Sequence, residues 1–366
     1  MRFPEFTEEW ETKPINDLAV VIGGGTPDTT VKSYWDGEIQ WFTPSEIGKT
    51  KYVDSSLRTI TEDGLNNSSA KRLPPNTILL SSRATIGECS LSLRECATNQ
   101  GFQSLVSKKC NVDFLYYLIQ TKKNDLIRKS CGSTFLEISA NEVRKIQVSI
   151  PSDVEQQKIA GLLSLIDERI TTQNKIIEDL KKLKSAISHI LFSSKGAIHL
   201  SEIANVVMGQ SPSSNAYNDQ GLGMPLVQGN LDISNGKTTP RLYTAEFNQT
   251  TEKGNIILTV RAPVGEVAKA TQKVCLGRGV CAIIPHEENM SDFIYQYLTF
   301  YKFMWRRYEQ GSTFTSINGS DVRNIFCPKV RNVSILTLLD IKINIEERVV
   351  KQYQSQKQYM LYQMFI

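Results

Sequence analysis

The chain has 366 residues, of which 40% are hydrophobic and 22% charged, a composition typical of a globular protein with two domains of ordinary size. No apolar run reaches the roughly 18 residues of a membrane span, Met1–Glu5 is unlike a signal peptide, and seven scattered cysteines suit a reducing compartment, so we expect a cytoplasmic protein. The formal net charge of +4 permits a polyanionic partner without requiring one.

The first part of the chain has the pattern of a small domain of mixed helices and strands. The glycines at 23–25 predict an irregular loop. The apolar run Asn76–Ser81 lies between turn residues and predicts a strand. Asp113–Arg128 begins with an aspartate and continues with apolar residues at helical spacing, which predicts a helix. We therefore expect an α/β (α+β) domain over residues 1–151.

A long helix is predicted next, over residues 152–195. Ser152 and Glu155 follow a proline with the spacing of a capping box. A stripe then recurs in alternating steps of four and three residues, which is the seam of a coiled coil. The stripe consists of Ile159, Leu163, Ile166, Ile170, Gln173, Ile177, Leu180, Lys184, Ile187 and Leu191. A single helix with one narrow apolar stripe needs a partner.

The second half of the chain repeats the first. Gly132–Phe135 recurs as Gly311–Phe314, and eight of the 15 positions in 132–146 match those in 311–325. The other matched segments are Thr26-Pro27 with Ser211-Pro212, Asn76–Ser81 with Ile256–Val260, Arg83–Glu88 with Arg261–Glu266, and Asp113–Arg128 with Asp292–Arg307. We therefore expect a second domain of the same class over 196–331, in tandem with the first.

A second long helix is expected over residues 332–366. Its predicted seam is Leu338, Ile341, Ile345, Val349, Gln352, Gln356 and Tyr359. Gln352 is separated from Gln173 by the same offset that separates Gly311 from Gly132. This helix is poorer in aliphatic residues than the first. In the simplest closed arrangement the two long helices pair with each other as an antiparallel coiled coil. The alternative, in which each seam recruits another chain, stays open.

Four motifs together resemble the specificity subunit of type I restriction-modification systems. They are Gly24–Pro27, Trp41–Ile47, Ser82–Gly87 and Pro151–Ile159. The resemblance covers nearly the whole chain and has the family's order of target-recognition domain, conserved helix, target-recognition domain, conserved helix. Pro328–Arg331 departs from the Pro-x-x-x-Glu-Gln pattern expected before the second helix.

The resemblance implies a non-catalytic subunit that binds a bipartite site in double-stranded DNA. It implies as partners two modification (methyltransferase) subunits and restriction (translocase/nuclease) subunits, with no membrane involved. S-adenosylmethionine, ATP and Mg are then expected only in the partner subunits, and no cofactor in this chain. A helix of roughly 40 residues is about 60 Å long, on the order of 15 base pairs. Its length would set the unread spacer between two half-sites.

Two kinds of residue are candidates for DNA contact. Repeated residues suit phosphate contacts, whereas base readers should differ between the copies. The repeated candidates are Arg83 with Arg261, Ser133 with Ser312, and Thr134 with Thr313. The differing pairs are Thr43 with Gln228, Ser45 with Asn230, and Gln100 with Arg278. For Arg83 and Arg261 a structural pairing with Glu88 or Glu266 stays open.

Basic residues also gather at the ends of the two shorter predicted helices. They are Lys122, Lys123, Arg128, Lys129, Lys302, Arg306 and Arg307. They are consistent either with non-specific attraction to phosphates or with a solvated helix face.

Motifs for catalysis are missing from the sequence. It has no Asn/Asp-Pro-Pro-Tyr/Phe element for a flipped adenine and no phosphate-binding loop of the Gly-x-x-x-x-Gly-Lys type. Asp153, Glu155 and Lys158 fit the start of a helix better than a nuclease centre. The histidines at 189, 199 and 286 lack metal-ligand spacing. A coiled-coil scaffold and an autonomous DNA-modifying enzyme are the alternatives to a DNA-recognition subunit.

Overall fold

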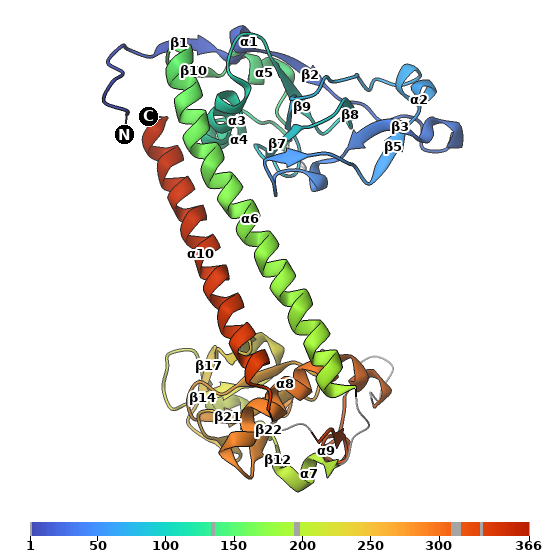
Figure 1. The fold of residues 1–366 in the computed structure, drawn as a ribbon, viewed down its shortest axis with the longest axis vertical. Helices are drawn as coiled ribbons and strands as arrows, with labels where there is room; N and C mark the ends of the chain where they lie inside the picture. Colours follow the sequence, from blue (N-terminus) through green and yellow to red (C-terminus); the bar gives the residue numbers. More distant parts are fainter. Residues whose placement is uncertain (1, 133–135, 194–197, 309–315, 330–331, 366) are drawn as a thin grey trace. The chain divides into compact units, whose positions relative to one another are not determined.

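The computed structural model describes residues 2–132, 136–193, 198–308, 316–329 and 332–365 (Figure 1). The chain divides into two compact units: unit 1 comprises Met1–Lys175 and Glu347–Ile366, and unit 2 comprises Ile176–Glu346. The division falls inside the long helices α6 (Asp153–Phe192) and α10 (Ser334–Met364). Each unit therefore holds one domain of strands and short helices, termed module 1 and module 2, together with a segment of both long helices.

Module 1 consists of two main sheets with short helices around them. Its strands are β1 (Glu11–Pro14), β2 (Ala19–Gly23), β3 (Trp35–Phe42), β4 (Tyr52–Val53), β5 (Arg58–Ile60), β6 (Ile78–Leu80), β7 (Cys89–Ser92), β8 (Cys96–Thr98), β9 (Gln103–Ser107) and β10 (Gln147–Ile150). Its helices are α1 (Ile15–Leu18), η1 (Lys32–Tyr34), η2 (Pro44–Glu46), α2 (Glu62–Asn66), α3 (Val112–Thr121), α4 (Lys123–Arg128) and α5 (Ala140–Lys145). The strand order is β2-β9-β6-β7-β4 in the larger sheet and β5-β3-β8 in the smaller one.

Module 2 has the same kind of architecture. Its strands are β11 (Ile198–His199), β12 (Ala204–Met208), β13 (Tyr217–Asn218), β14 (Met224–Val227), β15 (Ile233–Ser234), β16 (Lys237–Thr238), β17 (Leu242–Thr244), β18 (Thr250–Thr251), β19 (Ile256–Thr259), β20 (Val267–Lys269), β21 (Val274–Leu276), β22 (Val280–Pro285) and β23 (Phe326–Cys327). Its helices are α7 (Leu200–Ile203), η3 (Ser214–Ala216), η4 (Asn230–Asp232), η5 (Glu288–Met290), α8 (Ser291–Tyr301), η6 (Lys302–Arg307) and α9 (Gly319–Arg323).

The sheets confirm the repeat predicted from the sequence. The order β12-β22-β19-β20 in module 2 matches β2-β9-β6-β7 in module 1. The parallel pairing of β3 with β8 recurs between β14 and β21, and the antiparallel pair β1–β10 recurs as β11–β23. Each module is thus a mixed α/β domain, as expected.

Both predicted central strands and both predicted shorter helices form, and each of the two helices is interrupted once. The strands are β6 and β19, and all their side chains are buried. The first helix breaks between α3 and α4 at Lys122, and the second changes from α8 to the 3-10 helix η6 after Tyr301. At both breaks the loop after the central strand comes close: a Cβ on Gly87 would meet Lys123, and one on Gly265 would meet Trp305. In both modules the helix is therefore interrupted next to the place where the loop after the central strand packs against it.

Each module buries a separate hydrophobic core that includes side chains of the long helices. In unit 1, Phe114 of α3 packs in one cluster with Leu163 of α6 and Leu361 of α10. In unit 2, Phe293 of α8 packs in one cluster with Phe192 of α6 and Leu336 of α10. Full burial of such a side chain contributes about 1.5–3 kcal/mol. Each module is therefore fixed to the helix segments of its own unit.

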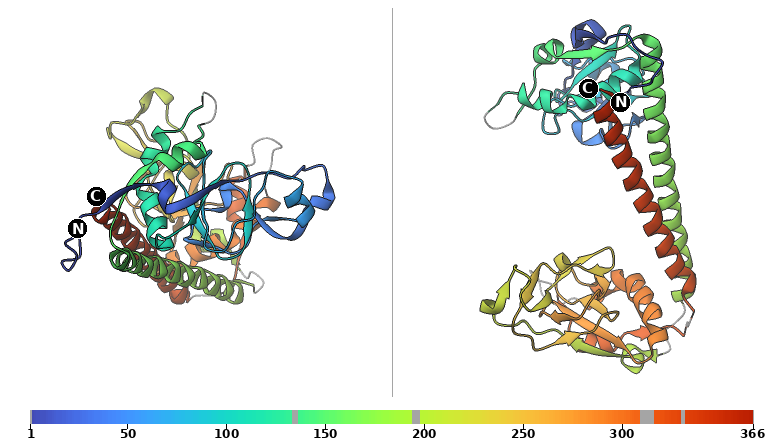
Figure 2. Two further views of the ribbon diagram at one scale, coloured as in Figure 1. Left: turned by 90° about the horizontal axis from the view of Figure 1, so that it is seen from above. Right: turned by 90° about the vertical axis from the view of Figure 1, so that its left-hand side faces the viewer.

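The predicted seam of α6 is confirmed. Leu163 is fully buried, Ile159, Ile166 and Ile177 are less than 9% exposed, and the other predicted seam residues are partly buried. Glu155 is an exception to the predicted helix start, because its buried carboxylate accepts hydrogen bonds from Arg2 at 2.8 Å. Within each unit α6 and α10 lie side by side (Figure 2).

The predicted seam of α10 is wrong. Leu338, Ile341, Ile345 and Tyr359 are 47–63% exposed. The apolar residues that α10 buries are Leu336, Ile343, Val350, Leu361 and Met364, and Glu346 is buried with them. The prediction aligned the two helices through Gln173 and Gln352, with the offset of the repeated modules, but the contacts of the helices repeat with a different offset.

The contacts between the long helices repeat with a smaller offset than the modules do. In unit 1, Lys357 of α10 forms an ion pair with Asp167 of α6 at 2.8 Å; in unit 2, Lys184 of α6 forms one with Asp340 of α10 at 2.5 Å. Asp340 follows Asp167 by the same number of positions as Lys357 follows Lys184. Higher residue numbers on α6 thus meet lower ones on α10, so the two helices pair antiparallel, as predicted.

Candidate nucleic-acid interface

The predicted contact residues of each module lie on loops that a shared set of backbone hydrogen bonds holds together. In module 1 the amides of Gly25, Asn99 and Ser82 donate to the carbonyls of Thr98, Phe42 and Gly101. In module 2 the amides of Gln210, Gly277 and Val260 donate in the same order to the carbonyls of Leu276, Val227 and Gly279, and all six bonds are 2.8–3.1 Å long. They join the ends of β3 and β8 to the loop after β6 in module 1, and the ends of β14 and β21 to the loop after β19 in module 2. We call each of these groups of loops a loop cluster.

The loop cluster of module 1 presents short polar side chains. Thr43 is the N-cap of η2, and its hydroxyl donates to Glu46 Oε2 at 2.6 Å. Ser45 is exposed, with its hydroxyl 3.1 Å from that of Thr43. Gln100 is exposed on the neighbouring loop and accepts a hydrogen bond from Thr26. All three side chains therefore make hydrogen bonds within the protein, and Ser45 and Gln100 are the two that are exposed.

Arg83 is neutralised inside the loop cluster of module 1. Its guanidinium lies 2.8 Å from Glu137 Oε2, and the two residues face each other across an antiparallel bridge. Glu88, the partner suggested by the sequence, pairs instead with Lys123. The sequence thus allowed an ion-paired arginine here, but the partner comes from a distant segment of the chain that follows α4.

The loop cluster of module 2 encloses a hollow of about 430 Å³. Three predicted contact residues, Gln228, Arg261 and Arg278, line it together. The other lining residues are Ser211, Pro212, Ser214, Tyr217, Gly229, Ala262 and Gly279. The predicted residue Asn230 follows directly in the chain as the first residue of η4. The structure therefore brings together residues that lie far apart in the sequence.

Backbone geometry keeps this hollow in shape. A Cβ on Gly279 would lie 2.1 Å from the Gln228 carbonyl oxygen, so no other residue fits there without movement. The Arg278 amide donates to Ser211 Oγ at 3.1 Å. Below the loop, buried Asp232 accepts from the Gln228 amide at 2.8 Å and pairs with Arg241 at 3.1 Å. The side chains of Arg261 and Arg278 are exposed.

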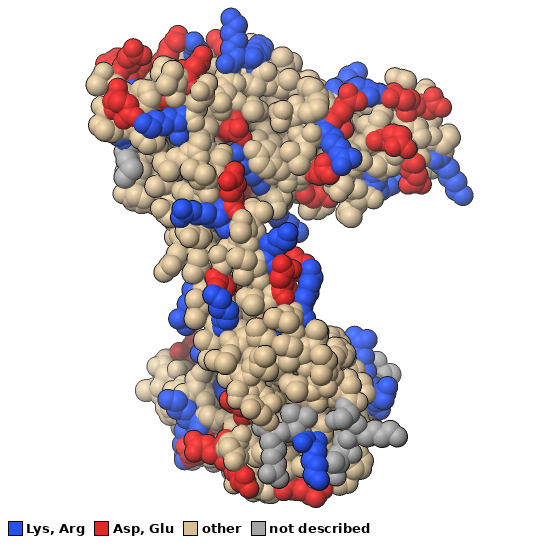
Figure 3. Space-filling view, in the orientation of Figure 1, with Lys and Arg blue, Asp and Glu red and all other residues tan. Residues whose placement is uncertain are grey.

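The remaining candidates divide into two groups. Ser133, Thr134, Ser312 and Thr313, in the repeated Gly-Ser-Thr-Phe segments, lie outside the described residues. Three of the seven residues at the basic helix ends form ion pairs: Lys123 with Glu88, Lys302 with Glu266, and Arg128 with Asp125. On the face drawn in Figure 3, Lys and Arg are interspersed with Asp and Glu. For these three residues the pairings favour the solvated helix face over a phosphate-binding one, and both readings stay open for Lys122, Lys129, Arg306 and Arg307.

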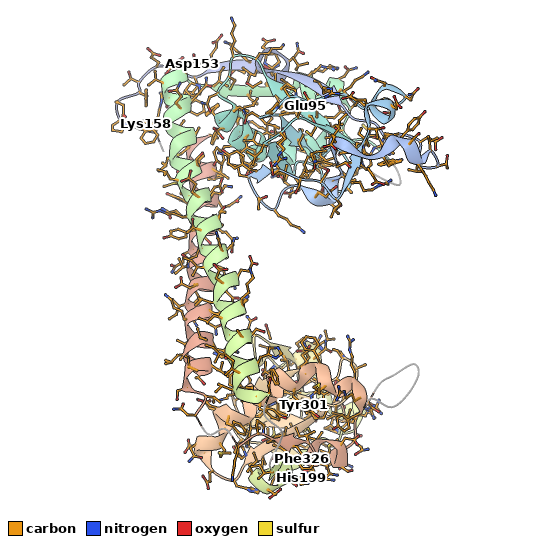
Figure 4. The ribbon with its side chains drawn as sticks, turned by 45° about the vertical axis from the view of Figure 1, so that its right-hand side comes forward. Glu95, Asp153, Lys158, His199, Tyr301 and Phe326 are labelled. Atoms are coloured by element: carbon orange, nitrogen blue, oxygen red, sulfur yellow. The ribbon has the colours of Figure 1, made fainter. Side chains whose placement is uncertain are left out.

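The residues that could have suggested catalysis or a metal site are held by structural contacts. Asp153 and Lys158 lie on the first turns of α6 (Figure 4). There Lys158 pairs with Glu5, and Glu155 pairs with Arg2. His199 packs on Phe326 with ring centroids 4.2 Å apart, and His189 on Phe300 at 5.0 Å. Among the described residues no group of His, Cys, Asp and Glu could hold a metal ion.

No described helix is both long and apolar enough to cross a bilayer.

Sequence reasoning missed Glu137 and its counterpart Ser316. Both form the bridge to the repeated arginine, Glu137 to Arg83 and Ser316 to Arg261. They occupy equivalent positions of the repeated motif but differ in charge. The offset that revealed the repeat also aligns these two residues, and their difference is the signal that could have found them.

Comparison with known proteins identifies the family of both halves of the chain. The profile of the family described as "Type I restriction modification DNA specificity domain" matches residues 7–182 and again 196–352. The MjaIX specificity subunit of a type I restriction enzyme from Methanocaldococcus jannaschii is 39% identical over 181 residues, which is 48% of this chain and 42% of that subunit. The chain thus spans less than half of that relative. The putative MjaX specificity subunit from the same organism is 28% identical over 88% of this chain and 84% of its own length.

Two solved structures share the fold. A chain from a study of complex assembly and conformational transition in the type I R-M system superposes with a TM-score of 0.64 and 20% identity, over 99% of this chain and 98% of that one. The type I restriction-modification S subunit from M. genitalium gives a TM-score of 0.62 and 20% identity, over 100% and 99%. At this identity the likeness establishes the fold.

Proposed function

Because this chain belongs to the family of type I restriction-modification DNA specificity proteins, we propose that it reads a two-part site in double-stranded DNA. Members of this family are DNA-recognition subunits rather than catalytic ones. One observation carries the proposal: the two loop clusters share their backbone hydrogen bonds but differ in the exposed side chains attached to them. That is the arrangement expected of two readers built on one scaffold for two different half-sites.

We assign different tasks to the side chains of the two clusters. Arg278 and Gln228 have the donors and acceptors that read guanine and adenine edges, and Ser45 and Gln100 are the exposed candidates in module 1. Arg261 suits a phosphate, because the same residue type occurs at the equivalent position of the other module. The serine and threonine hydroxyls of the Gly-Ser-Thr-Phe segments are proposed as further phosphate contacts.

The helix pair is proposed to set the length of the unread spacer. The helix α6 runs without interruption for 40 residues, which corresponds to about 60 Å. At the spacing of stacked base pairs this is on the order of 15 base pairs. The antiparallel ion pairs and the core contacts in each unit support a rigid connection between each module and its helix segments.

Modification subunits are proposed to dock on the exposed apolar face of the long helices. In unit 2, Leu338, Ile341 and Ile345 on α10 are 47–63% exposed, and in unit 1, Tyr359 and Tyr362 are 57% and 73% exposed. Such a stripe on a helix already paired through its other face is characteristic of a surface that another protein covers. These subunits would bring S-adenosylmethionine, and restriction subunits would bring ATP and Mg, in the cytoplasm.

Adenine methylation in the source genome tests this proposal. Profiling strains with and without the gene should show one methylated motif that disappears with the gene, and this motif should consist of two short halves separated by unspecified bases. A contiguous motif, or methylation that persists without the gene, would overturn the proposal. Methyl transfer to DNA by the purified chain alone would show that the chain is an enzyme instead.

A further inference from the structure

The two modules differ in whether their repeated arginine is neutralised. We propose that module 2 provides the stronger phosphate anchor on DNA of arbitrary sequence, through Arg261 and through Arg278, whose guanidinium contacts phosphate where its cognate base is absent, and that Glu137 restrains the equivalent Arg83 of module 1. This inference rests on the proposed function. It adds an unequal division of the electrostatic affinity between the two modules, with Glu137 and Ser316 as the residues that determine it.

The first observation is the exchange of the residue opposite the arginine. Arg83 and Arg261 follow equivalent strands, and each faces its partner segment across the same antiparallel bridge. In module 1 the partner is Glu137, whose carboxylate lies 2.8 Å from the guanidinium. In module 2 the partner is Ser316, which has no charge. Among the described residues no carboxylate forms an ion pair with Arg261.

The second observation is independent of the first and adds charge to the same module. Arg278 occupies the position of Gln100, and both Arg261 and Arg278 line one hollow with Ser211, Tyr217 and Gln228. The nearest buried carboxylate named above, Asp232, is already held by Arg241 and by a backbone amide. Two exposed guanidinium groups around one hollow favour an anion between them. The phosphodiester groups of DNA match this requirement.

The ion pair of module 1 opposes phosphate binding without preventing it. Arg83 and Glu137 are 42% and 37% exposed, so water screens their attraction and the arginine can leave its partner. The carboxylate nevertheless stays close by, and a phosphate that binds Arg83 meets its negative charge within the screening distance of physiological salt. Fewer counterions are then released per phosphate contact in module 1 than in module 2.

The salt dependence of binding measures this difference directly. The full chain is titrated with a DNA duplex of arbitrary sequence at several NaCl concentrations, and the slope of log K against log salt is compared among variants. Each lost phosphate contact should reduce the magnitude of the slope by about 0.9, which is a roughly threefold difference in affinity between 50 and 200 mM salt. In the Arg261→Gln/Arg278→Gln double variant the magnitude of the slope should fall by about 1.8, and in Arg83→Gln it should fall by clearly less than 0.9.

Exchanging the two partner residues provides the sharper test. Glu137→Ser should increase the magnitude of the slope by up to about 0.9, and Ser316→Glu should reduce that magnitude by a similar amount. Glu137→Ser is the decisive variant, because misfolding cannot strengthen binding. The control is Lys273→Gln, which removes one positive charge at the other end of β21 from Arg278, where Lys273 pairs with Glu252. It should leave the slope within error of the unmodified chain.

The outcomes separate this inference from the proposed function. An unchanged slope in Glu137→Ser, or equal losses in Arg83→Gln and Arg261→Gln, would overturn the inference while DNA binding itself remains. No binding of the unmodified chain to any duplex would overturn both. A slope reduced by Lys273→Gln as much as by Arg278→Gln would show that net charge alone accounts for the effect, and would also overturn the inference.

Discussion

The two modules have the same backbone framework but different exposed side chains. The hydrogen bonds that hold the loop clusters recur bond for bond, and so does the ion pair that links the loop after the central strand to the following helix, Glu88–Lys123 and Glu266–Lys302. By contrast, Gln100 has become Arg278 and Glu137 has become Ser316. The duplication has therefore kept the contacts that build the domain and changed the side chains that we propose to contact DNA or to face those contacts.

The long helices differ in another way. Phe192 of α6 packs on Phe293, and Phe365 at the end of α10 packs on Phe114, so the aromatic contacts of the two helices repeat with the offset of their ion pairs. The α10 helix begins at Ser334, after Asn332 has accepted a hydrogen bond from the Ser334 amide, and it has 31 residues against the 40 of α6. The α10 helix therefore repeats the contacts of α6, although it is shorter at its N-terminal end.

The largest effect is expected from changing the helices that connect the modules. Seven residues of helix-forming sequence inserted after both Lys175 and Glu346 keep the apolar seam in phase. They lengthen each helix by about 10 Å, which should shift the spacer of the recognised site by about three base pairs. Methylated motifs in cells that carry the variant report the spacer. Seven residues inserted in the β17–β18 loop of module 2 are the control and should not change it.

The two cores can be broken one at a time. Phe114→Ala and Phe293→Ala each remove a buried ring, with a cost of about 3–5 kcal/mol in the free energy of unfolding of the unit concerned. Hydrogen exchange resolved by peptide should show lost protection in unit 1 for the first variant and in unit 2 for the second. Phe303→Ala, at a residue that is 77% exposed, should change little. Equal loss in both units would show that the modules unfold as one body.

The repeated interhelix ion pairs should be unequal in strength. Each aspartate has a second donor at 2.6 Å, the Tyr117 hydroxyl for Asp167 and Gln296 Nε2 for Asp340, but Asp167 is 14% exposed whereas Asp340 is 31% exposed. We expect Asp167→Asn to lower the free energy of unfolding by about 1–3 kcal/mol and Asp340→Asn by less. Urea denaturation measures both. Lys182→Gln, in an exposed pair with Glu178, is the matched control with little expected effect.

The smallest effect concerns the reactivity of the cysteines. Module 1 has one exposed cysteine, whereas the described residues of module 2 include none. Burial raises the pKa of the thiols of Cys89, Cys110 and Cys281 to about 12. At pH 8 a maleimide should label exposed Cys131 alone, and all seven cysteines only after unfolding. Mass spectrometry counts the labels.

The raised thiol pKa values also predict a pH dependence. Because these thiols ionise more easily in the unfolded chain, their contribution to stability is complete below pH 9 and is lost as the pH rises towards 12. Unfolding midpoints measured from pH 8 to pH 11 should fall accordingly. Rapid labelling of Cys275 or Cys281 in the folded protein would contradict the burial on which this prediction depends.

Much of the fold could be predicted because the sequence contains its own comparison. Segments that match at a nearly constant offset, such as Arg83–Glu88 with Arg261–Glu266, revealed the tandem modules, and the spacing of Ile159 to Leu191 revealed the seam of α6. The predicted seam of α10 is wrong, because Gln173 and Gln352 repeat with the offset of the modules, whereas the contacts between the helices repeat with a smaller one. Register depends on contacts between helices, such as Lys184 with Asp340, and these are not local in the sequence.

The candidate site was harder to predict than the fold for the same reason. The sequence indicates Gln228, Arg261 and Arg278 as separate candidates, but only folding places them around one hollow. The partner of Arg83 could not be found nearby in the chain, because a bridge between distant segments brings Glu137 to it. Residue type suggests chemistry, whereas the combination of residues in a site depends on the long-range pairing of strands and loops.

The specificity of single-module variants tests the central claim, that the two loop clusters read separate halves of one site. Gln100→Arg and Arg278→Gln are introduced separately, and the methylated adenine motif of each strain is compared with that of the unmodified chain. The account predicts that each variant alters one half of the motif, a different half in each case, with the spacer unchanged. Changes in the same half for both variants, or a motif that is contiguous, would contradict it.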